Sequence, residues 1–271
     1  MSRTSRLFIK SLDTSKSCNL LNRTVWDPWT VAKRYYPAPV KRFYLNASVA
    51  RGDTGYEIHL DRKPLKTPTK KALTIKSEKL ANAVAAEWCA QKDVIAPNVM
   101  HLTALCNTVQ DNPLRKTKDD LIGAVLAALP MDTILFRSDD NDKLSELQKE
   151  KWDPIYNWFQ DHFNVEVPLA TGIICPEIPD ETLDKIRDFL DSNNFEAVQG
   201  FVFGMDSIRS VVLTTATVMN KITPKEAVHL SRLELEYQTA RWGTVEWHHE
   251  VELFDSIARL SAATLFFDTH T

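Results

Sequence analysis

Two Glu-x-x-His elements contain the residues of this sequence best suited to chemistry. Glu226 and His229 form the first element, and Glu246 and His249 form the second. Each would place a carboxylate and an imidazole on one helix face, as in the di-iron sites of helical bundles. We expect consecutive helices that fold back around Gly243, which puts Glu226 roughly 24 Å from the turn at 1.5 Å per residue. Glu246 would lie within one turn of Gly243, so the sequence argues against a shared metal ion.

These residues also have structural interpretations. Thr223-Pro224-Lys225-Glu226 fits a capping box with proline at the first helical position. His248 and His249 are adjacent, and we expect their side chains to point in different directions rather than to chelate. We therefore predict no metal site and no cofactor.

Other catalytic motifs are weak or missing. Asp53-Thr54-Gly55 spells the aspartic-protease triplet, but that chemistry needs two such loops. The other Asp-Thr, at positions 132–133, is followed by isoleucine, so we interpret the triplet as a hairpin turn. The sequence has no Gly-x-Ser-x-Gly and no glycine-rich phosphate loop among its seven glycines. We predict no catalytic residues.

One segment mixes acids, aromatics and arginine in a way typical of protein interfaces, residues 231–243. The same segment has a plainer interpretation, because apolar residues recur along it at helical spacing. They would form a core stripe with Glu234 and Glu236 on its solvated flank, and Gly243 would end the helix. The pattern alone favours this stripe, which consists of Leu230, Leu233, Tyr237 and Ala240.

Charge is unevenly distributed along the chain. Residues 1–34 hold seven basic and two acidic side chains, and the remainder holds 26 basic and 34 acidic ones. A basic, Ser/Thr-rich leader is typical of a mitochondrial transit peptide, with a disordered basic tail as the alternative. The net charge of -3 gives no reason to expect nucleic acid binding. No apolar run approaches the roughly 20 residues that span a bilayer.

Hydrophobic periodicity predicts the elements. Alternation over 43–49 and 56–60 around the 51–55 turn indicates a hairpin, within a small antiparallel sheet over 42–76. Residues 132–137 resemble a short buried strand. The remaining periodic segments indicate helices, and 168–179 looks like a connector. The expected helices begin at Ser77 and then cover 100–109, 116–129, 143–163, 180–193, 197–220, 224–242 and 245–267.

These elements predict an α+β fold. We expect a leader over 1–40, a small antiparallel β-rich N-terminal domain with helices over 41–130, and a mainly α-helical C-terminal domain over 131–271. Trp88 lies on an apolar helical stripe and is expected in the core. Cys89 and Cys106 are expected to be buried thiols, and no cysteine pair has metal-site spacing.

Several separated motifs resemble the mitochondrial ATP synthase F1-sector assembly factor 2 family, the chaperones of the ATPase alpha subunit. The resemblance covers residues 41–267, and the absence of glycine between Asp61 and Arg62 is a small departure from the family's turn. The matching segments are 41–44, 56–68, 87–88, 100–103, 132–134, 152–154, 231–238, 241–243 and 246–247.

The resemblance implies a non-enzymatic chaperone in the mitochondrial matrix that binds the unassembled alpha subunit until it joins the beta subunit. We expect a free monomer, and a partner surface on the C-terminal helices. The residues that we expect on it are Glu226, Glu234, Glu236, Arg241, Trp242 and Glu246. Two alternatives stay open. One is a metal-binding helical bundle. The other is a matrix hydrolase, which needs one cavity shared by several of Asp132, His229, Glu246, His248 and His249.

Overall fold

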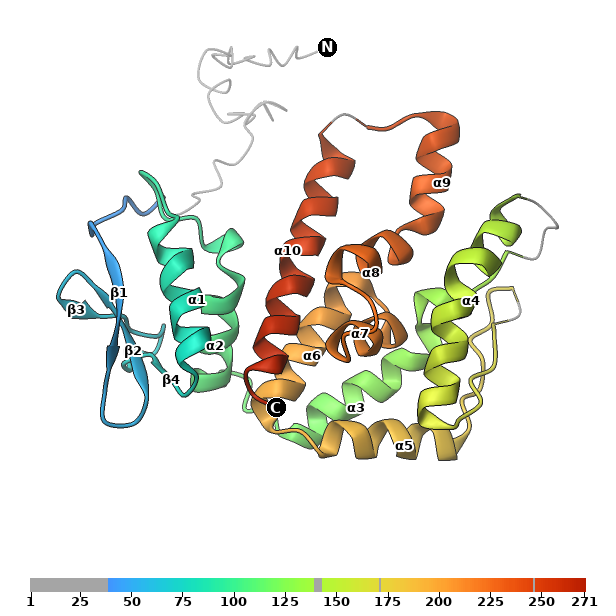
Figure 1. Cartoon of the computed structure of the whole chain (residues 1–271), viewed down its shortest axis with the longest axis horizontal. Coiled ribbons are helices and arrows are strands. Elements are labelled where there is room, and N and C mark those ends of the chain that lie inside the picture. Colours follow the sequence, from blue (N-terminus) through green and yellow to red (C-terminus); the bar gives the residue numbers. More distant parts are fainter. Residues whose placement is uncertain (1–38, 139–142, 171, 246) are drawn as a thin grey trace, which may run out of the picture. The chain divides into compact units, whose positions relative to one another are not determined.

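A small antiparallel sheet opens the fold and helices form the rest (Figure 1). The computed structural model describes residues 39–138, 143–170, 172–245 and 247–271. The predicted α+β class is confirmed. The expected leader lies almost wholly outside the described residues, and the domain division near residue 130 stays a prediction.

The sheet is built around one hairpin. Strand β1 (Ala47–Arg51) pairs antiparallel with β2 (Tyr56–Leu60), with Val49 opposite Ile58. The short strands β3 (Lys63–Pro64) and β4 (Thr74–Ile75) also pair antiparallel with β2. The Asp-Thr-Gly triplet lies in the β1–β2 turn, as predicted. A Cβ atom at Gly55 would lie 2.7 Å from a backbone oxygen of β4, so this turn requires glycine.

Two helices pack with this sheet, α1 (Glu78–Cys89) and α2 (His101–Asp111). Ser77 caps α1 by accepting a hydrogen bond from the Leu80 amide. Near the end of α1, the Glu87 carboxylate accepts hydrogen bonds from the Leu102 and Thr103 amides at 2.7 and 2.8 Å. One helix therefore satisfies the orphan amides of the next, which fixes α2 against α1.

The helical part has a larger core of its own. Helices α6 and α10 share an extensive interface, and a Cβ atom at Gly200 in α6 would approach the Phe266 ring to 3.0 Å. A side chain at this position would press on the Phe266 ring, so glycine favours the close packing of the two helices. The helices of this part are α3 (Lys118–Ala128), α4 (Lys143–Phe163), α5 (Asp180–Asp191), α6 (Phe195–Ile208), α7 (Val211–Val218), α8 (Pro224–Ser231), α9 (Leu233–Trp242) and α10 (His248–Asp268).

The strand predicted over 132–137 is wrong. Residues Thr133–Leu135 form a 3₁₀ turn. The Asp132 carboxylate accepts a hydrogen bond from the Ile134 amide at 3.1 Å, which favours a tight turn over an extended strand. Only Phe136 makes a strand-like contact, an isolated parallel bridge to Ala170.

Two helices predicted as continuous are each broken in two. The 197–220 helix ends at Arg209, which is left-handed with φ 52°, and Ser210 caps the next helix, α7. The 224–242 helix breaks at Arg232, between α8 and α9. The predicted stripe is therefore interrupted: Leu233 is buried, whereas Ala240 at the far end is exposed.

Two core predictions are only partly right. Cys106 is buried, and burial raises the pKa of its thiol to about 12, but Cys89 is exposed at the end of α1. Trp88 packs against the smaller core while remaining only half-buried. The exposed end of α1 therefore contributes a surface as well as core residues.

Candidate functional site

Large apolar side chains are exposed where α9 ends and α10 begins. Trp242 and Trp247 are 71% and 74% exposed, and Val245 lies between them at 64%. Val251 and Phe254 follow on α10, three residues apart on one face and also mostly exposed. We call these five residues the α9–α10 apolar surface. Several large apolar side chains exposed within one short stretch of sequence make this region a candidate binding surface.

Local backbone chemistry creates this exposure. Gly243 ends α9 with φ 91°, and Trp247 precedes α10 with φ 67°, so the chain leaves the helical path at both points. Arg232, at the α8–α9 break, holds the start of α10 through an ion pair to Glu252 at 2.9 Å and a hydrogen bond to the His249 carbonyl. Residues 243–245 thus leave the end of α9 before α10 begins (Figure 1).

Of the six predicted partner residues, only Trp242 belongs to the α9–α10 apolar surface. Glu226 is exposed and forms the predicted capping box with Thr223, whose amide and hydroxyl hold its pKa below the usual range. Trp242 is exposed, and the Arg241 guanidinium lies 5.4 Å from its ring centroid. Glu246 falls outside the described residues.

The other two predicted residues have partners within the protein. Glu234 accepts a 2.7 Å hydrogen bond from the Gln148 side chain of α4, so its carboxylate faces that helix. Glu236 binds the His229 ring at 2.6 Å. The His229–Glu236 contact braces α8 against α9 across their break.

The histidines at the start of α10 lie closer together than the sequence suggested. Ligand atoms of His248, His249 and Glu252 all lie within 4.8 Å of one another. Our expectation that the two histidines diverge is therefore wrong. However, the Arg232 guanidinium already pairs with Glu252, and a positive charge there disfavours a cation.

Asp132 has structural contacts in place of the hydrolase partners that we considered. Its side chain is fully buried and accepts hydrogen bonds from the Ile134 and Val212 amides at 3.1 and 2.9 Å. His229 binds Glu236 instead. The described contacts do not assemble these groups into one catalytic cluster.

Comparisons with known proteins agree on one family. A family model described as ATP12 chaperone protein matches residues 41–160. "Protein atp12, mitochondrial" of Schizosaccharomyces pombe is 28% identical over 272 residues, covering 96% of this chain and 91% of its own. The crystal structure of Atp12 from Paracoccus denitrificans aligns with a TM-score of 0.75 and 26% identity, over 86% of this chain and 99% of that one. A putative chaperone from Agrobacterium tumefaciens aligns with a TM-score of 0.78 and 27% identity, over 85% and 86% of the two chains.

The chain is similar to ATP12 chaperones, in sequence over residues 41–160 and in structure over 86% of its length. Across the described residues, no helix combines the length and apolarity needed to cross a membrane.

Sequence reasoning missed four members of the α9–α10 apolar surface: Val245, Trp247, Val251 and Phe254. From the sequence they fall in or beside the expected 245–267 helix, and none of them was assigned to a surface. The glycine at 243 was the available signal, because a helix end before four apolar residues leaves them without a buried face. These residues are close in sequence to Trp242, the predicted partner residue that is also largely exposed.

Proposed function

We propose that this F1-ATPase assembly chaperone holds the unassembled alpha subunit until the beta subunit takes its place. The observation that carries the proposal is the α9–α10 apolar surface, whose two tryptophans are 71% and 74% exposed. An unassembled subunit exposes the apolar patch that its neighbour will cover, and such patches drive aggregation. A chaperone with a matching apolar surface protects that patch reversibly.

The acidic and basic side chains around this surface set the orientation of the client. Seven acidic and three basic residues lie within residues 224–255. Charges at the rim of an interface steer association and exclude wrong partners more than they add affinity. Trp242 and Trp247 supply the anchors, and Glu226, Glu234, Glu236, Arg241 and Glu246 supply the charged rim.

The same proposal covers where the protein is located and its oligomeric state when no client is bound. The name of the S. pombe relative supports a mitochondrial protein. We place this chaperone in the matrix, where its basic leader would deliver it, as a monomer that acts without hydrolysing ATP. Release of the alpha subunit then depends on competition by the beta subunit, because the chaperone and the beta subunit would cover the same patch on it.

Capture of the purified alpha subunit tests the proposal. We expect the double variant Trp242→Ala/Trp247→Ala to lose at least about tenfold in affinity, because a truncated aromatic anchor costs about 2 kcal/mol. Ile173→Ala is the matched control, since this side chain is 95% exposed on the α4–α5 connection. It should capture the alpha subunit like the unaltered protein.

Two results would contradict the proposal. The unaltered protein could fail to bind the alpha subunit, or the double variant could bind as well as the control. Circular dichroism of each variant confirms that folding is intact.

A further inference from the structure

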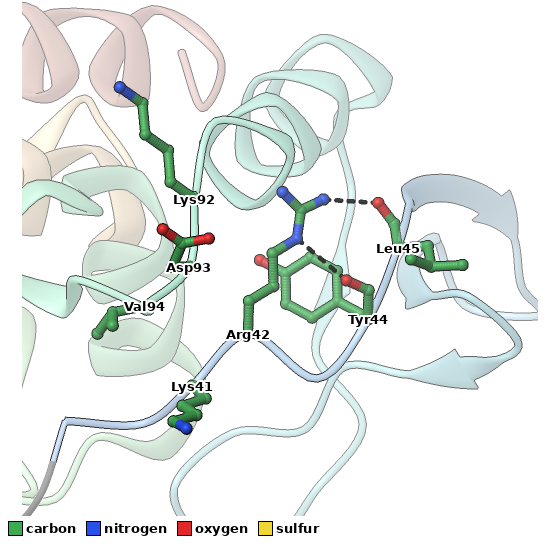
Figure 2. A pocket seen from close by; sticks show the side chains of 7 residues that line it. All are labelled: Lys41, Arg42, Tyr44, Leu45, Lys92, Asp93 and Val94. Carbon is green, nitrogen blue, oxygen red and sulfur yellow. Dashed lines mark hydrogen bonds between the residues drawn. The ribbon is translucent and has the colours of Figure 1, made fainter.

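A second surface lies at the opposite end of the sequence, around residues 41–45. A cavity of about 780 Å³ is lined by three aromatic residues and three basic ones. We call it the aromatic–basic groove, and its defining residues are Phe43, Tyr44, Arg62, Lys63, Lys66 and Trp88. A second hollow of about 660 Å³ shares Tyr44, and Lys41 and Lys92 add further positive charge there (Figure 2).

The wall of the groove is aromatic and fixed in place. Tyr44 packs between Phe43 and Trp88 with ring centroids 5.4 and 5.6 Å apart, and its hydroxyl donates to the Trp88 carbonyl at 2.7 Å. Arg42 holds the segment by donating to the carbonyls of Tyr44 and Leu45 (Figure 2). Phe43 nevertheless remains 68% exposed. An ordered aromatic wall that faces solvent is suited to an apolar side chain of a partner.

The rim of the groove carries uncompensated positive charge. Arg62, Lys63 and Lys66 are exposed and form no ion pair with any residue that the structure describes. The nearby Asp61 carboxylate is occupied by the Leu45 and Asn46 amides at 3.1 and 2.9 Å. Asp61 also lines the groove, so the lining carries three cations and one carboxylate that is bound to backbone amides.

The excess of positive charge extends over the whole β-rich segment. Residues 41–76 hold nine basic and three acidic side chains, the reverse of the balance in residues 224–255. The two surfaces therefore select opposite charge. Electrostatic complementarity of this kind steers the encounter and fixes the register of a partner.

We propose that the aromatic–basic groove binds a second segment of the client, one in which an apolar side chain is flanked by carboxylates. The inference rests on the proposed function, because the client is the alpha subunit held at the α9–α10 apolar surface. The groove has the volume of a site for a few side chains rather than for a folded face. Two separate contacts on one client raise the overall affinity through effective concentration.

Charge and client access argue against the other occupants. The chain's own residues 1–34 hold seven basic and two acidic side chains, so they would be repelled by the basic rim. A second copy could place its acidic C-terminal helices in the groove, but that contact would cover both client surfaces.

Photo-crosslinking separates these possibilities. p-Benzoylphenylalanine is installed at position 43 in one variant and at position 242 in another, and each is irradiated with purified alpha subunit. We expect both positions to crosslink to the alpha subunit. Peptide mapping should place the position-43 crosslink in an apolar stretch flanked by Asp or Glu.

Charge reversal provides a second readout. Arg62→Glu/Lys63→Glu/Lys66→Glu should weaken capture about fivefold at low salt, with a smaller effect at high salt because rim charges are screened. The matched control reverses three exposed cations elsewhere, Arg115→Glu/Lys116→Glu/Arg187→Glu, and should capture normally.

The outcomes distinguish this inference from the function on which it rests. Crosslinking from position 242 but not from position 43 overturns the groove and leaves the proposed function standing. Crosslinking from neither position overturns both. A position-43 crosslink to residues 1–34 or to a second copy assigns the groove to that occupant and refutes a client contact.

Discussion

Asp132 is an ionisable residue in a fully buried environment. Its side chain is fully buried and joins the 3₁₀ turn of residues 133–135 to the start of α7 through the Ile134 and Val212 amides. Burial raises the pKa of the carboxyl to about 6, although these amides and Ser210 favour the ionised form. The charge of a side chain that joins two backbone segments therefore depends on pH.

This link predicts how stability depends on pH. Between about pH 4 and pH 6 the folded protein keeps a proton on Asp132 that the unfolded chain releases. The free energy of unfolding should therefore fall as pH rises through this window, by about 3 kcal/mol from this residue. Asp132→Asn should remove that component, as measured by urea unfolding at pH 4 to 7. An equal stability difference between the two proteins at every pH would contradict it.

Side-chain contacts could be predicted from the sequence where the two partners are close together along the chain. The Thr223–Glu226 capping box was predictable because its four residues contain the whole interaction. The Glu234 contact was not, because its direction depends on Gln148, 86 positions away. The same limit applies to His248 and His249, whose proximity depends on the start of α10.

Helix extents were predictable from periodicity, but helix breaks were not. The 143–163 helix was placed correctly from its apolar spacing. The breaks at Arg209 and Arg232 carry no glycine or proline, so no strong helix-breaking residue marks them. The α8–α9 break sets the course of α9, which begins at the buried Leu233 and is exposed at Ala240.

Helix α8 allows the two roles of Glu226 to be separated. Glu226→Gln keeps a capping box but removes the charge, so we expect normal stability with weaker capture of the alpha subunit. Thr223→Ala keeps the charge but loses the cap, which costs about 1 kcal/mol, so capture should survive. Thermal unfolding and binding are measured on both variants. Full capture by Glu226→Gln would remove Glu226 from the partner surface.

At the scale of the whole molecule, α10 joins two hydrophobic clusters. Ala262 and Phe266 pack in the smaller cluster with the sheet, α1 and α2, while Leu260 and Phe267 pack in the larger helical one. The sequence showed the apolar residues of this helix but not their division. That division depends on how α10 packs against α6 and α2, and both helices lie far away in sequence.

This shared helix predicts that the two clusters unfold together. Phe266→Ala should lower the free energy of unfolding by about 3–5 kcal/mol, because it removes a fully buried ring and leaves a cavity. Hydrogen exchange should show lost protection in both α1 and α6, since α10 is packed against each side of the core. The matched control is Phe254→Ala on the same helix, where the ring is 68% exposed and its loss should leave unfolding unchanged. Lost protection confined to α1 would mean that the helical cluster is stable on its own, and α10 would then be a lid on the smaller cluster rather than the element that couples the two.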